Sequence, residues 1–101
     1  MNNRILIFAV NRKRGLDFFD NLVGEFKYKD VNKIRKNSNE YFMELNDGTT
    51  YQVVSASDNS RGYKCNKAYV ENGTNKEIIN NVIIPTLIMS TLPTEEQIEY
   101  F

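Results

Sequence analysis

The sequence predicts a small, layered α/β domain in which helices pack on a mixed sheet. Three observations predict this class. An apolar run of strand length lies near the start of the chain, an alternating hairpin pattern lies in its middle, and segments with helical spacing separate the strands. The predicted order is β-α-β-β-β-α-β in a single domain of residues 1–101. Because strands alternate with helices, part of the sheet is expected to be parallel.

The first predicted strand and helix are defined by their apolar residues. Residues 4–10, RILIFAV, form a nearly continuous apolar run, as in a strand buried on both faces of a parallel sheet. The polar segment 11–15, NRKRG, breaks the pattern. Apolar residues then recur at helical spacing over 16–26, which predicts an amphipathic helix that Gly24 weakens near its end. Residues 27–39 are polar and basic, and both a short strand and a loop stay open there.

The middle of the chain predicts a β-hairpin. Side chains alternate in character over 41–45 and again over 51–55, as expected for two strands with one buried face. Between them lies the turn sequence 46–49, NDGT. Asp47 and Gly48 are expected to supply the positive-φ positions of a tight turn.

The last third predicts a short strand followed by a helix. Residues 67–70, KAYV, form the strand, and the sequence 74–77, TNKE, predicts a capping box. In that motif the Thr74 hydroxyl and the Glu77 carboxylate each accept a hydrogen bond from a backbone N–H. The apolar face of the following helix comprises Ile78, Ile79, Val82 and Ile83.

Pro85 is expected to end this helix because it lacks a backbone N–H. Residues 87–89, LIM, predict a last strand. The sequence 94–97, TEEQ, predicts a second capping box, which opens a terminal turn or helix over the final residues.

Charge and composition restrict the classes of function. Thirteen basic and thirteen acidic residues cancel, so there is no overall attraction to nucleic acid or membrane. The chain has no long apolar segment for secretion or membrane insertion, which predicts a cytoplasmic location. The cations are unevenly placed, which indicates either a basic face or a solvated surface. Nine of them crowd the first third: Arg4, Arg12, Lys13, Arg14, Lys27, Lys29, Lys33, Arg35 and Lys36.

The chain has no histidine and a single cysteine, Cys65. Zinc sites of the usual Cys/His kind and Ser-His or Cys-His dyads are therefore excluded, and we expect no metal and no cofactor. Lys64 and Lys67 could lower the pKa of the Cys65 thiol, but a structural or merely exposed thiol is the commoner situation.

Five short motifs resemble, in order, the middle of the ATPase domain of phage large terminases and related helicase-like P-loop NTPases. Residues 5–14, ILIFAVNRKR, resemble the strand and loop that follow the nucleotide-binding helix. Residues 40–57 resemble the family's hairpin, and 60–63, SRGY, its Arg-Gly loop. Residues 67–72, KAYVEN, fall where the family has the Walker B strand, and 88–92, IMSTL, resemble its coupling strand.

The departures from this family concern its catalytic residues. The Walker A sequence is absent, so no glycine loop is present to hold phosphates. Glu71 stands where the metal-holding Asp should be. Asn72 stands where the water-activating Glu should be, and an amide cannot take a proton. The resemblance therefore implies a non-catalytic descendant, encoded by a phage or mobile element and acting in the host cytoplasm.

The carboxyl edge of the sheet is the predicted site, because ligands of open α/β sheets bind there. If the loop around Arg61 folds toward this edge, five cations form one patch for phosphates, and Tyr63 can stack a base. The alternative is a solvated basic loop. Asp58 and Glu71 could also hold Mg²⁺ in a residual nuclease or NTPase, although a surface ion pair or turn cap is commoner. The five cations are Arg12, Lys13, Arg14, Arg61 and Lys64.

The sequence as a whole favours a protein that works by binding. A truncated P-loop-like sheet leaves edges and faces that need a partner or a second copy to cover them. The leading hypothesis is an accessory factor or inhibitor that binds a protein, for example one of a host defence system. The alternative hypothesis is nucleic-acid binding through the basic patch.

Overall fold

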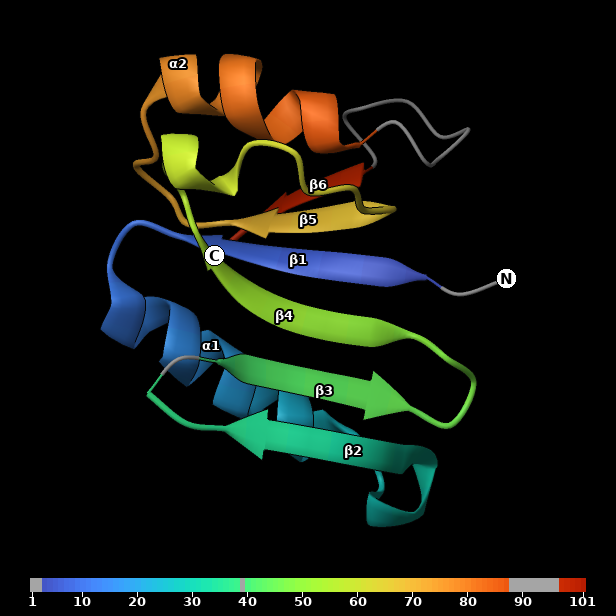
Figure 1. Ribbon diagram of the computed structural model, residues 1–101. Helices are drawn as coiled ribbons and strands as arrows, with labels where there is room; N and C mark the ends of the chain where they lie inside the picture. Colours follow the sequence, from blue (N-terminus) through green and yellow to red (C-terminus); the bar gives the residue numbers. More distant parts are fainter. Residues whose placement is uncertain (1–2, 39, 88–96) are drawn as a thin grey trace.

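A six-stranded mixed sheet organises the part of the chain that the structure describes, residues 3–38, 40–87 and 97–101 of a computed structural model (Figure 1). The strand order is β2-β3-β4-β1-β5-β6. β1 pairs in parallel with β4 and β5, and β5 pairs in parallel with β6, whereas β2, β3 and β4 form an antiparallel meander. The strands and main helices are β1 (Arg4–Ala9), α1 (Arg12–Glu25), β2 (Val31–Lys36), β3 (Tyr41–Leu45), β4 (Thr50–Ser55), β5 (Lys67–Val70), α2 (Lys76–Ile78) and β6 (Ile98–Tyr100).

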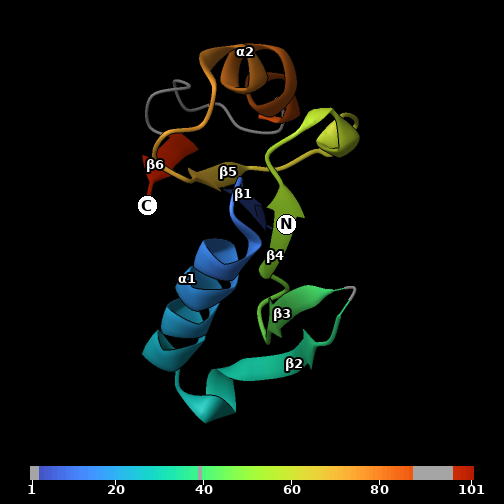
Figure 2. The ribbon, with the colours of Figure 1, turned by 90° about the vertical axis from the view of Figure 1, so that its left-hand side faces the viewer.

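β1 lies at the centre of the sheet and divides the core into two. Successive side chains of a strand point to opposite faces. Ile7 packs on one face with Phe19 and Leu22 of α1. Leu6 and Phe8 pack on the other face with the helical segment after β5. The predicted strand buried on both faces is thus confirmed, and the domain has three layers, with α1 and α2 visible on different sides of the sheet in Figure 2.

α1 begins earlier than the predicted helix. The segment 11–15, expected to be a break, forms the cap and first turn, because the Asn11 side chain accepts a hydrogen bond from Arg14 N at 3.3 Å. The exposed first turn needs no apolar residues, so the apolar spacing starts one turn later. Gly15 allows close packing, since a Cβ there would lie 2.5 Å from the Ala9 Cβ. Gly24 lies inside the helix near its end.

Residues 27–39, left open by the sequence, contain a 3-10 turn at Tyr28–Asp30 and the edge strand β2. The predicted hairpin of β3 and β4 is confirmed. Its turn differs from the expected one, because only Gly48 has positive φ, at 92°. The hydrogen bonds from Gly48 N and Leu45 N, to Leu45 O and Thr49 O, make a three-residue connection, in which Asp47 keeps an ordinary φ and accepts from Thr49 N.

β5 is confirmed, but the predicted capping box after it is wrong. The N-cap of α2 is Asn75, whose side chain accepts from Glu77 N at 2.7 Å. The Thr74 hydroxyl instead donates to the Glu71 carbonyl. The helical run continues as a π turn, Ile79–Ile83, and a 3-10 turn, Ile84–Thr86, which contains Pro85 and ends the run as expected.

The chain's last described segment is a strand. The terminal turn or helix expected from the second capping box is wrong for residues 98–101, because β6 joins the open edge of β5. Phe101 continues the pairing, donating to Val70 O and accepting from Asn72 N. Of the strand predicted at 87–89, Leu87 is a buried residue outside any strand. Residues 88–96, with the coupling-strand motif and most of the second capping box, lie outside the described residues.

Candidate functional site

The Glu71 carboxylate lies at the carboxyl edge of the sheet, between β1 and β5. The chain leaves β1 toward α1 on one face and leaves β5 toward α2 on the other, and open α/β sheets hold their ligands at such a point. Here Glu71 Oε1 accepts hydrogen bonds from Val10 N at 3.1 Å and from Asn11 N at 2.9 Å. Its Oε2 lies 3.7 Å from Arg14 Nη1, and the residue is only 6% exposed. An internal carboxylate therefore already binds the backbone amides and the cation at this point of the edge.

Asn72, at the position of the water-activating Glu, and Asp58, of the hypothesised Mg²⁺ site, lie apart from such a role. Asn72 is exposed, and its backbone N–H donates to Phe101 O at 2.7 Å. The Asp58 carboxylate pairs with Arg61 at 2.9 Å instead of facing Glu71. Among the described residues, no three acidic, Cys or His side chains gather closely enough to hold a metal ion. Both carboxylates of the hypothesised Mg²⁺ site, Glu71 and Asp58, therefore already have protein partners.

The structure divides the predicted basic patch into two groups. Arg12, Lys13 and Arg14 form the exposed first turn of α1, and Arg12 Nη2 donates to the Ser38 carbonyl in the β2–β3 turn. Arg61 belongs to the second group, on the side of the helical run, where its Nη1 donates to Asn81 O at 3.2 Å. Pro85 has no N–H to donate to that carbonyl, so Arg61 supplies a bond that the helix lacks.

Tyr63 and Lys64 continue this second group. With Arg61 they line a hollow of about 120 Å³ beside Pro85. The Tyr63 ring lies under a cation, with the Arg4 guanidinium carbon 5.4 Å from its centroid. It is therefore already stacked within the protein.

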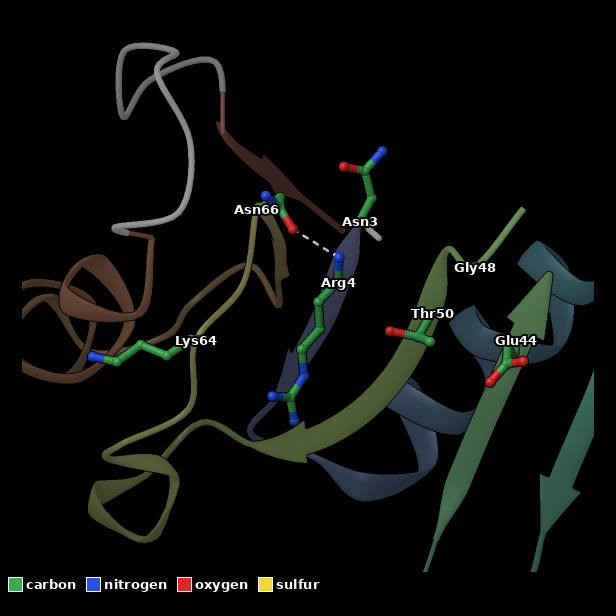
Figure 3. Close-up of a pocket in the computed structure, with 7 residues that line it drawn as sticks. All are labelled: Asn3, Arg4, Glu44, Gly48, Thr50, Lys64 and Asn66. Atoms are coloured by element: carbon green, nitrogen blue, oxygen red, sulfur yellow. Dashed lines mark hydrogen bonds between the residues drawn. The ribbon is translucent and has the colours of Figure 1, made fainter. Parts of the chain in front are cut away.

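A larger hollow, of about 410 Å³, lies at the amino edge of the sheet and was not predicted from the sequence (Figure 3). Arg4 N is anchored to Asn66 Oδ1 at 2.8 Å, and the Arg4 side chain extends along the sheet, while Lys64 points away from it. Glu44 and Thr50 lie across the opening. Two cations and one anion share this wide hollow, so its lining carries only a small net positive charge. The only feature of the sequence that pointed to this hollow was Arg4, a charged residue at the start of an apolar strand.

A third hollow, of about 380 Å³, lies beside the edge strand β2. Its apolar lining comes from the end of α1 and from the segment that follows: Val23, Phe26, Tyr28, Val31 and Ile34. Two of these side chains are unusually accessible for their size, Tyr28 at 96% and Ile34 at 41%. Because Tyr28 and Ile34 are isolated among charged residues, they produced no clear pattern in the sequence.

Cys65 is a residue of the core, with its Sγ 3.5 Å from Thr86 Oγ1. Burial raises the pKa of its thiol above the ordinary value, so the reactive-thiol alternative fails and the structural one holds.

Together these features define a three-layered mixed α/β domain in which an internal carboxylate binds two backbone amides at the carboxyl end of β1. Comparisons with models of protein families, with curated proteins and with solved structures found no match for this chain. Within the described residues, no helix has the length and apolar character needed to cross a membrane.

Proposed function

We propose that this protein works by binding a protein partner, as an accessory factor or inhibitor, and carries out no catalysis. The observation that carries the proposal is the outer strand β2, which ends the sheet beside an apolar hollow. Five of its six residues are exposed. An unpaired sheet edge with exposed apolar side chains next to it is a common basis of protein recognition.

The engagement of Glu71 at the carboxyl edge supports the same proposal. Catalysis at that edge of an α/β sheet requires side chains free to meet a substrate. Glu71 is held by two backbone N–H groups and Arg14, which leaves its carboxylate a structural role. A phage or mobile-element origin, with action on a host defence system, stays a prediction from the resemblance to terminase ATPases.

The second candidate function is nucleic-acid binding, which one observation favours. The contact between Arg12 and Ser38 places the first turn of α1 next to the β2–β3 turn. The cations of α1 therefore lie near those at the end of β2, Arg35 and Lys36, and could contact phosphates together.

One experiment compares the two functions. The protein is selected against a displayed library of random peptides and, separately, titrated with a mixed DNA and RNA oligonucleotide pool under light scattering. The protein-binding proposal expects saturable peptide binders, retained when Arg12 and Lys13 are changed to Ala; Arg14 is kept for its ion pair with Glu71. An oligonucleotide complex that dissociates as salt rises, and disappears in that variant, would support the second candidate instead.

Catalysis is tested separately. Nucleotides and oligonucleotides are incubated with the protein and Mg²⁺ or Mn²⁺, and turnover that Glu71→Gln abolishes without unfolding the protein would refute the non-catalytic assignment.

A further inference from the structure

We infer that β2 is the docking edge for an extended, acidic segment of the partner, which joins the sheet as an additional strand and inserts one apolar side chain into the hollow beside β2. This inference rests on the proposed function and specifies the chemistry of its partner. The backbone, the hollow and the charges of β2 each support it.

The backbone of β2 presents two residues outward. In an antiparallel pair, opposed residues alternate between those that share hydrogen bonds and those that do not. Asn37 N donates to Glu40 O, so that pair is bonded. By alternation Lys36 and Ile34, opposite Tyr41 and Met43, direct their N–H and C=O groups away from β3. No other described strand lies on that side of β2.

The hollow lies beside these outward groups and on one face of the sheet. Ile34 is paired with Met43, which belongs to the core under α1, so Ile34 and the hollow share that face. A strand added along β2 would alternate its side chains between the two faces. A large apolar side chain opposite Ile34 would cover Tyr28, which is otherwise almost fully exposed.

The charges of β2 select an acidic occupant. Between residues 27 and 36 there are five cations and one acid, Asp30. Arg35 projects on the face opposite Ile34 and lies 3.4 Å from the Glu40 carboxylate, whereas Lys33 lines the hollow itself. A second copy of β2 would place like charges opposite one another, which is destabilising in a sheet. Acidic side chains on the added strand would meet these cations, so a partner of opposite charge fits better than self-association.

A nucleic acid would use only part of this surface. Phosphates could contact the cations, but they would leave the apolar hollow exposed and could not complete a β-ladder with both N–H and C=O groups. An extended protein segment uses all three features at once.

The test uses a synthetic peptide in which Glu and Leu alternate, long enough to pair with the six residues of β2. A peptide of the same composition in blocks, and one with Lys in place of Glu, serve as controls. Binding is followed by fluorescence anisotropy and by amide hydrogen exchange. We expect the alternating acidic peptide to bind and to protect the Ile34 and Lys36 amides, whereas the two control peptides bind at least about tenfold more weakly.

Two variants remove the backbone and apolar contributions. Ile34→Pro deletes an outward N–H and leaves the bonds to β3, as proline is tolerated on edge strands. Tyr28→Ala removes an exposed wall of the hollow without touching the core. Each is expected to weaken the peptide about tenfold. If Ile34→Pro unfolds the protein, Tyr28→Ala and the exchange pattern still decide the matter.

A third pair of variants tests the charges. Lys33→Glu with Arg35→Glu is compared with Lys64→Glu and Lys76→Glu, which change the net charge equally at exposed sites elsewhere. Only the first pair should abolish binding.

The outcomes separate the inference from the proposed function. No binding by the alternating acidic peptide, or binding without protection at Ile34 and Lys36, overturns the inference. If library peptides then bind elsewhere on the protein, the protein-binding function stands. If no peptide binds and oligonucleotides do, the proposed function itself fails.

Discussion

The structural role of Glu71 can be measured by replacing it with Ala and with Gln. Glu71→Ala deletes the acceptor of two backbone N–H groups and the partner of Arg14. Glu71→Gln keeps an acceptor oxygen but removes its charge. The matched control is Asn72→Ala, since the Asn72 side chain is exposed and its backbone makes the bond to Phe101.

The magnitude follows from the hydrogen bonds and the ion pair that the Ala substitution removes. A hydrogen bond to a charged group contributes about 1.5–3 kcal/mol, and the lower value applies here because both hydrogen bonds are only part-buried. Two such bonds give about 3 kcal/mol. The ion pair adds at most about 0.5 kcal/mol because Arg14 is half exposed. We therefore expect a loss of about 3–4 kcal/mol for Glu71→Ala and about 1–1.5 kcal/mol for Glu71→Gln, against under about 0.5 kcal/mol for Asn72→Ala.

Urea unfolding followed by circular dichroism measures these free energies, with an unchanged slope required for each comparison. The sign of the result is informative. A carboxylate kept for substrate or metal often destabilises its protein, so its removal raises stability. If Glu71→Ala unfolds at the same or a higher urea concentration than the unmodified protein, the structural role of Glu71 is refuted and a site for ligands must be reconsidered there.

Three further predictions concern other positions. Gly15→Ala should lower the free energy of unfolding by about 1–3 kcal/mol because its Cβ would overlap Ala9. Gly24→Ala, whose Cβ meets nothing within 4 Å, should raise it by about 0.5–1 kcal/mol. Equal effects of the two substitutions in thermal unfolding would contradict this contrast. Asn75→Ala should lower the free energy of unfolding by about 1 kcal/mol, because Asn75 is the N-cap, and Glu77→Ala should leave it almost unchanged. A larger effect of Glu77→Ala than of Asn75→Ala would support the capping box expected from the sequence. Burial raises the pKa of the Cys65 thiol and of the Tyr51 phenol. The unfolded state therefore loses these protons at lower pH than the folded state, and the free energy of unfolding should fall as pH rises above about 8.5. A free energy of unfolding that stays constant up to pH ~10.5 would contradict this prediction.

The elements recovered from the sequence are those with a local signature. β1 is apolar along its length because it is covered on both faces, and the β3–β4 hairpin alternates because its strands have one face under α1. β2 gave no comparable signal. It lies at the edge of the sheet, and only Val31 and Ile34 pack toward the apolar side, so most of its residues are free to be charged.

The candidate site depended on contacts between distant parts of the chain. The sequence located Glu71 at the end of a strand, but its partners Val10 and Asn11 lie about sixty residues earlier. Only the pairing of β5 with β1 brings them together. Similarly, Arg61 lies in a loop that the sequence allowed to fold toward either side of the sheet. The Asn81 carbonyl that Arg61 contacts lacks a helix partner because of Pro85, twenty-four residues after Arg61.

The central position of β1 has a consequence for how the chain folds. Its neighbours come much later in sequence, with Arg4 opposite Thr50 and Ile5 opposite Lys67. During synthesis β1 leaves the ribosome long before β4 and β5 are made, so its apolar side chains have no sheet to pack into until then. The β2–β3–β4 meander needs only short loops and can form first. Folding should then be limited by closure of the long loop that brings β1 between β4 and β5, which places this small domain among the slower two-state folders.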